Sequence, residues 1–313
     1  MKIWELTLNY QAANTVSSGW HGSLNLVYAH RQGGTQLIGD RMKAPLKVQR
    51  PFYPEGPEIC HSVILHTAGG MVGSDRLSLN VHLQSNAQAL ITTAAASKIY
   101  RSNGLPAQQT IQMQVDADAC LEWLPQETII FNGAIYRQDL RVELAPNATW
   151  LGWEITRFGR SARGEKFLQG NWRSHTEIWQ QGQPLWIDRQ WLPGSEAIIT
   201  SPHGLAGYPI TASLTWIGKP VSPQLVETVR NLWQTKPLSL DGRGVGGEGE
   251  YVRGLGGANA PGEVGVTRLT HGLLCRYRGA STTEARTWFT ATWHLLRQFL
   301  LERPAMLPRV WQR

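Results

Sequence analysis

Alternation of apolar and polar residues is the feature that most constrains how this sequence folds. Segments with this pattern include residues 24–28, 77–83, 111–115 and 140–144. Successive side chains of a strand point to opposite faces, so a period of two predicts strands with one buried face. Turn signals separate these segments over about 200 residues, which is typical of a mainly β protein. No repeat of fixed length is evident, and this disfavours a regular propeller or solenoid.

Two α-helices are predicted in the C-terminal third. Ser222 and Pro223 supply an N-cap and a first-turn proline for one helix. Residues 281–284 read Ser-Thr-Thr-Glu, a capping box, and a broad apolar face follows until Pro304 ends the pattern. The aromatic side chains of this second face either pack in the core, which is the interpretation we favour, or fill a groove on a partner.

The length of 313 residues suits one β-rich domain or two smaller ones. We predict one domain over residues 1–313, interrupted by a glycine-rich segment. Residues 241–262 contain nine glycines in 22 positions. Such a composition buries too little apolar surface to offset the entropy of ordering, so we predict a mobile loop there.

Charge and cysteine content narrow the range of partners and compartments. The net charge is +7, but the basic residues are scattered, which disfavours a nucleic-acid surface. Three separated cysteines, Cys60, Cys120 and Cys275, predict free thiols in a reducing compartment. No signal-peptide pattern or apolar run of membrane-spanning length occurs. The expected location is cytoplasmic, without membrane attachment.

The segment His66–Leu77 reads HTAGGMVGSDRL and joins two predicted strands. Three glycines in five residues permit positive φ or close backbone approach. The stretch is not a phosphate loop or a dinucleotide fingerprint, because no Gly-Lys-Ser/Thr follows and the next element is a strand. The sequence of this segment is compatible with a tight structural turn and with a functional turn.

No catalytic or metal-binding motif is complete in this sequence. Cys60, His61 and His66 lack the spacing of a closed metal site, and no Gly-x-Ser-x-Gly elbow is present. Glu122 and Glu127 are interpreted as surface glutamates. These residues favour a binding or assembly protein over an enzyme. The 14 tryptophans leave an alternative, a β-rich carbohydrate-binding or carbohydrate-active protein.

Four ordered stretches resemble the urease accessory protein UreD (UreH) family: His66–Leu77, Thr92–Ser102, Leu121–Phe131 and Arg160–Phe167 with Gly170. The ending Pro308-Arg-Val-Trp311 is also similar, and the resemblance extends over residues 15–313. The chain departs from the family pattern at Thr67-Ala68, Ser74 and Asn132, which argues against essential roles for those positions. Residues 241–262 resemble an insertion.

The resemblance implies a cytoplasmic chaperone that is not itself an enzyme. It implies binding to apo-urease and to UreF, through which the GTPase UreG is recruited, and an assembly that is a dimer of UreD–UreF pairs. The implied fold consists of stacked β-sheets of helix-like or sandwich character with two helices. No cofactor is held tightly, and nickel is in transit through an internal passage to the urease active site.

Two sets of residues are candidates for these roles. Charged residues on the matched turns are candidates for the polar lining of the nickel passage: Asp75, Arg76, Glu127, Arg160, Arg163 and Glu165. The alternative is that these charges only brace the turns. Aromatic and basic residues near the C-terminus are candidates for partner binding: Trp288, Trp293, Phe299, Arg309 and Trp311.

Overall fold

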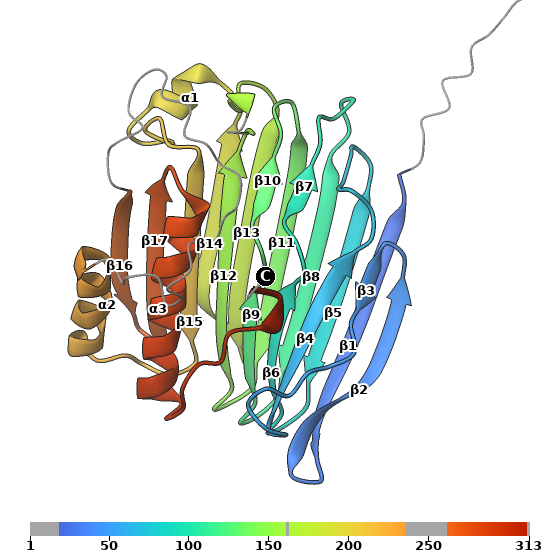
Figure 1. Cartoon of the computed structure of the whole chain (residues 1–313), viewed down its shortest axis with the longest axis vertical. Helices are drawn as coiled ribbons and strands as arrows, with labels where there is room; N and C mark the ends of the chain where they lie inside the picture. Colours follow the sequence, from blue (N-terminus) through green and yellow to red (C-terminus); the bar gives the residue numbers. More distant parts are fainter. Residues whose placement is uncertain (1–18, 161–162, 236–261, 312–313) are drawn as a thin grey trace, which may run out of the picture.

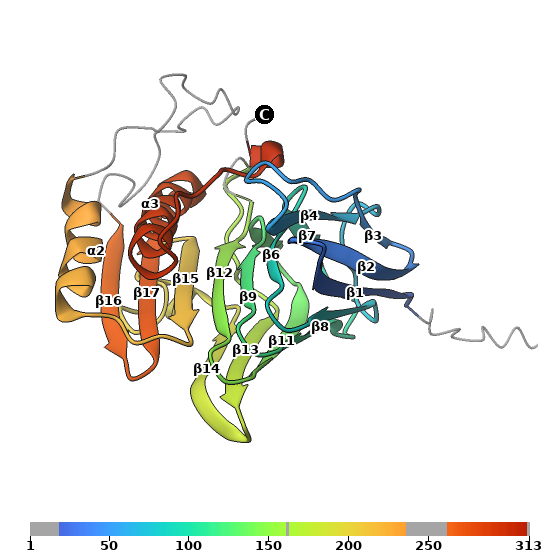
Figure 2. The same ribbon diagram turned by 90° about the horizontal axis from the view of Figure 1, so that it is seen from below.

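The structure is a computed structural model that describes residues 19–160, 163–235 and 262–311. It consists of two stacked β-sheets with helices against one of them (Figures 1 and 2). The fold is mainly β, as the sequence predicts. The glycine-rich segment 241–262 lies outside the described residues, except for Gly262.

The first sheet has seven strands. In spatial order they are β14 (Gln183–Pro193), β13 (Asn171–Gln180), β11 (Ile135–Leu144), β8 (Ala107–Val115), β5 (Arg76–Leu83), β1 (His21–Arg31) and β2 (Gly34–Lys43). The alternating segments predicted from the sequence lie in this sheet, and their apolar side chains face the second sheet. In β5, for example, Leu77, Leu79, Val81 and Leu83 are all buried.

The second sheet has ten strands. Its main path is β16 (Glu263–Leu269), β17 (Gly272–Gly279), β15 (Ile210–Ile217), β12 (Thr149–Phe158), β9 (Cys120–Leu124), β6 (Gln88–Thr93), β4 (Ile59–His66) and β3 (Leu46–Val48). The short strands β10 (Thr128–Ile130) and β7 (Ser97–Ile99) attach beside the end of β12. Strands β9 and β4 are nearly continuously buried, because this sheet is covered on both faces.

The chain alternates between the two sheets and winds as a solenoid. Strands β5, β8, β11 and β13 pair in parallel in one sheet, and β4, β6, β9 and β12 pair in parallel in the other. The sequence-based argument against a regular solenoid was therefore wrong about the winding. The strands of the first sheet start at residues 76, 107, 135 and 171, so the repeat is structural without a fixed length.

Three α-helices lie in the described residues. Helices α2 (Pro223–Thr235) and α3 (Thr282–Leu300) are where the sequence predicts them. The Ser281 hydroxyl caps α3 by accepting a hydrogen bond from the Glu284 amide at 3.2 Å. The five-residue helix α1 (Glu196–Thr200) was missed, since it is too short to show a helical period. Helix α3 packs on β12, β15 and β17 of the ten-stranded sheet.

Candidate functional site: a polar cavity between the two sheets

Four successive turns stack on one another at one end of the solenoid. The Met71 amide donates to the Lys98 carbonyl, Ser102 donates to Gly133, and Gly133 donates to Gln169. These bonds link, in order, turns that belong to the four stretches with the family resemblance or directly follow them. The matched stretches are thus adjacent turns of one structure, although they are far apart in the sequence.

Close backbone approach explains two glycines in this stack. Gly70 has φ +153°, and a Cβ there would lie 2.4 Å from the Lys98 carbonyl oxygen. Gly170 has φ +107°, and a Cβ there would lie 2.1 Å from the Ala134 carbonyl oxygen. No other residue type fits these positions without displacing the neighbouring turn.

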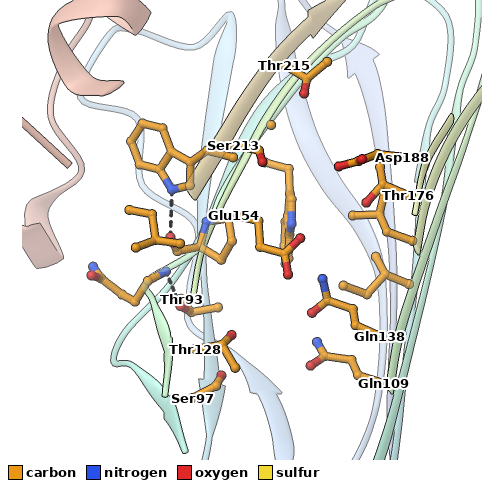
Figure 3. A pocket seen from close by; sticks show the side chains of 18 of the residues that line it. Thr93, Ser97, Gln109, Thr128, Gln138, Glu154, Thr176, Asp188, Ser213 and Thr215 are labelled. Atoms are coloured by element: carbon orange, nitrogen blue, oxygen red, sulfur yellow. Dashed lines mark hydrogen bonds between the residues drawn. The ribbon is translucent and has the colours of Figure 1, made fainter. Parts of the chain in front are cut away.

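A cavity of about 60 Å³ lies between the sheets, next to the stacked turns. Its volume is sufficient for a few water molecules. Figure 3 shows polar side chains on both walls. Gln109, Gln138, Thr176 and Asp188 come from the seven-stranded sheet, and Thr93, Ser97, Thr128, Glu154, Ser213 and Thr215 come from the other side.

Glu154 projects from β12 into the middle of this space (Figure 3). Its Oε2 accepts a hydrogen bond of 2.9 Å from the Ser174 hydroxyl on β13, in the opposite sheet. Desolvation raises the pKa of the Glu154 carboxyl to about 7, although the Ser174 hydrogen bond opposes the shift. Burial in this cavity therefore favours the protonated form of the Glu154 carboxyl more than water does.

A second polar link joins the sheets beyond Glu154. Asp188 of β14 forms an ion pair of 2.7 Å with Arg276 of β17. The same guanidinium donates to the Ser213 hydroxyl at 2.6 Å and lies over the Trp186 ring at 6.0 Å. Arg276 compensates the charge of Asp188, so Glu154 is the lining carboxylate that has no ion-pair partner within the described part of the chain.

The cavity offers oxygen atoms and a titratable carboxylate, which are ligands that hard divalent cations accept. No group of three or more His, Cys, Asp or Glu side chains is placed to hold a metal ion within residues 19–160, 163–235 and 262–311. This lining offers a cation single carboxylates and neutral oxygens. It lacks the closed set of ligands that retains a metal.

The sequence-predicted lining residues lie at the turns, outside the set that lines the cavity. Asp75 is buried in the first turn, where its Oδ2 accepts from the Val72 amide at 2.8 Å. Its Oδ1 has no hydrogen-bond partner in the part of the chain that the structure describes. Arg76 follows at the start of β5 and is exposed. Both residues are at the same end of the solenoid as the cavity.

The remaining charged candidates are on later turns of the same stack. Arg160 Nε donates to Glu165 Oε2 at 2.6 Å, and Glu165 Oε1 accepts from the Asn132 amide at 2.8 Å. Arg163 is exposed. Glu127 forms an ion pair of 2.5 Å with Arg286 of α3. These contacts brace the turns, which is the alternative role considered from the sequence.

The candidates for partner binding divide into buried and exposed groups. Trp288 and Trp293 are buried against the ten-stranded sheet, so the assignment of these two side chains to a partner surface needs correction. They fit the core-packing alternative. Phe299 is 61% exposed and Arg309 is exposed. Trp311 is half-buried and stacks on Trp153 with ring centroids 5.3 Å apart.

Sequence reasoning missed a buried charge network that fastens α3 to the sheet. Arg297 is fully buried, and its guanidinium donates to both Glu122 oxygens at 2.8 Å and to Glu55 Oε2 at 2.5 Å. His61 contacts Glu55 at 2.6 Å, and the Trp293 indole donates to Glu122 at 2.8 Å. Glu122 is therefore not a surface glutamate. Its partner is 175 residues away, so no local pattern indicates it.

Few tryptophans of the described residues are exposed, Trp20 at 38% and Trp191 at 61% among them. Most of those described are inside the core: Trp123, Trp150, Trp153, Trp172, Trp216, Trp288 and Trp293. Sugar stacking requires exposed rings, so the abundance of tryptophan reflects packing between sheets and helices. No helix among the described residues is long and apolar enough to span a membrane.

Together, the two stacked sheets and the small polar cavity between them define a mainly β, solenoid-like protein. The chain belongs to the UreD urease accessory protein family, whose model matches residues 21–312. The resemblance found in the four turns is thereby confirmed.

Similar proteins cover nearly the full length. A protein of Nostoc punctiforme named urease accessory protein UreD is 68% identical over 95% of this chain and 98% of its own length. A protein of the same name from Nostoc sp. is 64% identical, over 96% of this chain and 98% of its own length. A more distant protein of the same name, from Methylobacillus flagellatus, is 36% identical over 97% of this chain and 98% of its own length.

Proposed function

We propose that this protein is a maturation scaffold that binds apo-urease and UreF and helps deliver nickel to the urease active site. UreG is recruited through UreF, and the working assembly is a dimer of UreD–UreF pairs in the cytoplasm. Residues 1–313 act as one unit, and the chain is not itself an enzyme. Membership of a family of urease accessory proteins supports this role.

The polar cavity that contains Glu154 is the observation that best supports a passage for nickel. A core between two sheets is normally apolar, and buried polar groups carry a desolvation penalty unless they are paired. Here several amides, several hydroxyls and the two carboxylates of Glu154 and Asp188 face one space that can hold a few water molecules. Single carboxylates and neutral oxygens suit a cation that exchanges part of its hydration shell and moves on without being retained.

Nickel is the cargo in this proposal. Glu154 would contact the cation electrostatically when its carboxyl is deprotonated, and Gln109 and Gln138 supply neutral oxygens on the opposite wall. Asp188 is already paired with Arg276 and contributes less. Asp75, Arg76, Glu127, Arg160, Arg163 and Glu165 are proposed as polar positions at the end of the passage, where the turns stack.

Co-purification tests the proposal directly. The tagged protein is expressed with UreF, UreG and apo-urease, and nickel is counted in the recovered urease. We expect a complex of all four proteins and nickel-dependent activation of urease. A chain that purifies alone and leaves urease without nickel would show that the proposed role is wrong.

The sequence-predicted lining is tested in the same assay. Asp75→Ala and Glu165→Ala are expected to lower the nickel content of urease without abolishing complex formation. Because Asp75 and Glu165 also accept backbone hydrogen bonds, thermal unfolding of both variants must be measured alongside. Normal nickel content of urease with both variants would show that Asp75 and Glu165 do not line the passage.

A further inference from the structure

The outer face of the seven-stranded sheet is not covered by any described helix. Figure 2 shows α2 and α3 on the far side of the ten-stranded sheet, and α3 contacts β12, β15 and β17 there. The opposite face, formed by β1, β5, β8, β11, β13 and β14, carries the polar members of the alternating strands. It is therefore available to a partner.

One row of side chains crosses this face in register. Strand pairing aligns, from β1 to β14, His21, Arg76, Gln108, Arg137, Arg173 and Trp191. We call these six residues the arginine row. Neighbouring strands are about 4.8 Å apart, so the row extends over about 24 Å. That length matches the width of a protein–protein interface of ordinary size.

The charges of the arginine row are only partly compensated. Arg137 forms a bidentate pair with Asp139, and Arg141, two rows further along β11, pairs with both Glu143 and Glu177. Arg76 and Arg173 make no ion pair within the described part of the chain. Arg137 and Arg173 lie directly opposite each other on adjacent strands, so two like charges are adjacent there and only that of Arg137 is paired with a carboxylate.

The row ends in an exposed aromatic side chain. Trp191 is 61% exposed, and the Arg173 guanidinium lies 5.3 Å from the centroid of its ring. Tryptophan and arginine are the residue types most enriched among those that dominate binding energy at interfaces. The Trp191 indole also donates to Asn171 Oδ1 at 3.2 Å, and restraint of the ring by these contacts reduces the entropy lost when a partner binds.

We propose that the arginine row is the docking surface for an acidic face of the urease apoprotein. The inference rests on the proposed function, because that function supplies the identity of the partner. The row provides the positive charge and Trp191 provides an anchor. Asp139, Glu143 and Glu177 on the same face disfavour a phosphate backbone, since an evenly negative polymer would meet these carboxylates.

The test compares two charge-reversal variants with matched exposure. Arg76→Glu with Arg173→Glu removes the two uncompensated charges. Lys219→Glu with Arg268→Glu makes the same change in net charge at exposed positions away from this face. Each variant is purified with UreF, and retention of UreF together with an unchanged melting temperature shows that it is folded. Binding to purified apo-urease is then measured at low and high salt.

We expect the arginine-row variant to bind apo-urease at least about tenfold more weakly at low salt, with a smaller salt dependence, whereas the control stays within about twofold of the wild type. Equal binding by the arginine-row variant and the wild type would overturn the docking assignment and leave the proposed function intact. Loss only of duplex DNA binding would overturn it in favour of a nucleic acid. If the wild-type complex with UreF does not bind apo-urease, the proposed function itself is wrong, and the docking assignment is wrong with it.

Discussion

The Ser174 hydroxyl donates a hydrogen bond of 2.9 Å to Glu154 Oε2 and so connects the two sheets across the cavity. Ser174 belongs to β13 and Glu154 to β12, so a single bond joins consecutive strands of the solenoid on opposite walls. The bond holds the carboxylate in the space between the sheets. It also favours the charged form, against the desolvation that favours the neutral one.

Replacement of Glu154 tests its proposed contact with the cation. Glu154→Gln keeps the shape and the acceptor for Ser174 but removes the charge. We expect nickel transfer to urease to slow roughly tenfold, equivalent to about 1.4 kcal/mol on the barrier, while complex formation is unchanged. Glu143→Gln, the same substitution on the outer face of the sheet, is the control and should transfer nickel normally. Equal rates for the two variants would exclude Glu154 from the passage.

The raised pKa of Glu154 predicts a specific dependence of stability on pH. The carboxyl titrates at about 7 in the folded protein, against an ordinary value of 4.5. Between these pH values the folded state keeps a proton that the unfolded state releases, so this group's contribution to stability falls as pH rises through the window. Urea unfolding of the wild type and of Glu154→Gln from pH 4.5 to 8 measures this contribution as the difference in the free energy of unfolding. The difference between the two curves should flatten above pH 7, and a constant difference would contradict the assignment.

Loss of the buried guanidinium should destabilise the protein strongly. Arg297→Met removes the ion-pair partner of the buried Glu122 and leaves Glu55 with His61 alone, and breaking such a network removes about 3–5 kcal/mol of stability. Lys166→Met is the control, because its ion pair with Glu196 is exposed and contributes less than about 1 kcal/mol. Chemical denaturation of both variants gives the comparison. Similar losses of stability in the two variants would show that the Arg297 network is not a main interaction between α3 and the sheet.

Gly170 should not tolerate a side chain. Gly170→Ala combines a φ of +107° with a Cβ 2.1 Å from the Ala134 carbonyl oxygen, and we expect a loss of about 3 kcal/mol or more. Gly33→Ala is the control. It also has positive φ, +76°, but nothing lies within 4 Å, so only the backbone preference of about 1–2 kcal/mol is lost. Thermal unfolding distinguishes the two, and equal losses would contradict close stacking of the turns.

Phe299 is the exposed aromatic side chain of α3, and its replacement tests the partner-binding hypothesis. We expect Phe299→Ala to weaken co-purification with UreF about tenfold, because exposed aromatic anchors dominate interface energies. Met42 is 48% exposed on β2, the edge strand of the seven-stranded sheet, and is the control. The Met42→Ala variant should bind UreF as the wild type does. If both variants retain UreF equally, the interface lies elsewhere.

Local patterns predicted the strands and the two long helices because each depends on residues that are close in sequence. The period of two in residues 77–83 and the capping serine of α3 are examples. The solenoid winding was not predictable in the same way, since turns of unequal length hide the repeat. Glu154 was missed because its strand is apolar around it, and its partner Ser174 belongs to the opposite sheet. The cavity is lined by strands of both sheets that are far apart in the sequence, so no local pattern indicates it.

The Arg297 network also determines when the protein can complete its fold. Arg297 follows Glu122 by 175 residues and Glu55 by 242 residues in the chain. During synthesis on the ribosome both carboxylates emerge long before the guanidinium that neutralises them, and the outer face of the ten-stranded sheet stays open until α3 has been made. The apolar face of β12 and β15 therefore stays uncovered from the time these strands are made until α3, near the end of the chain, is made. Packing of α3 on this face is one of the last steps that complete the native fold.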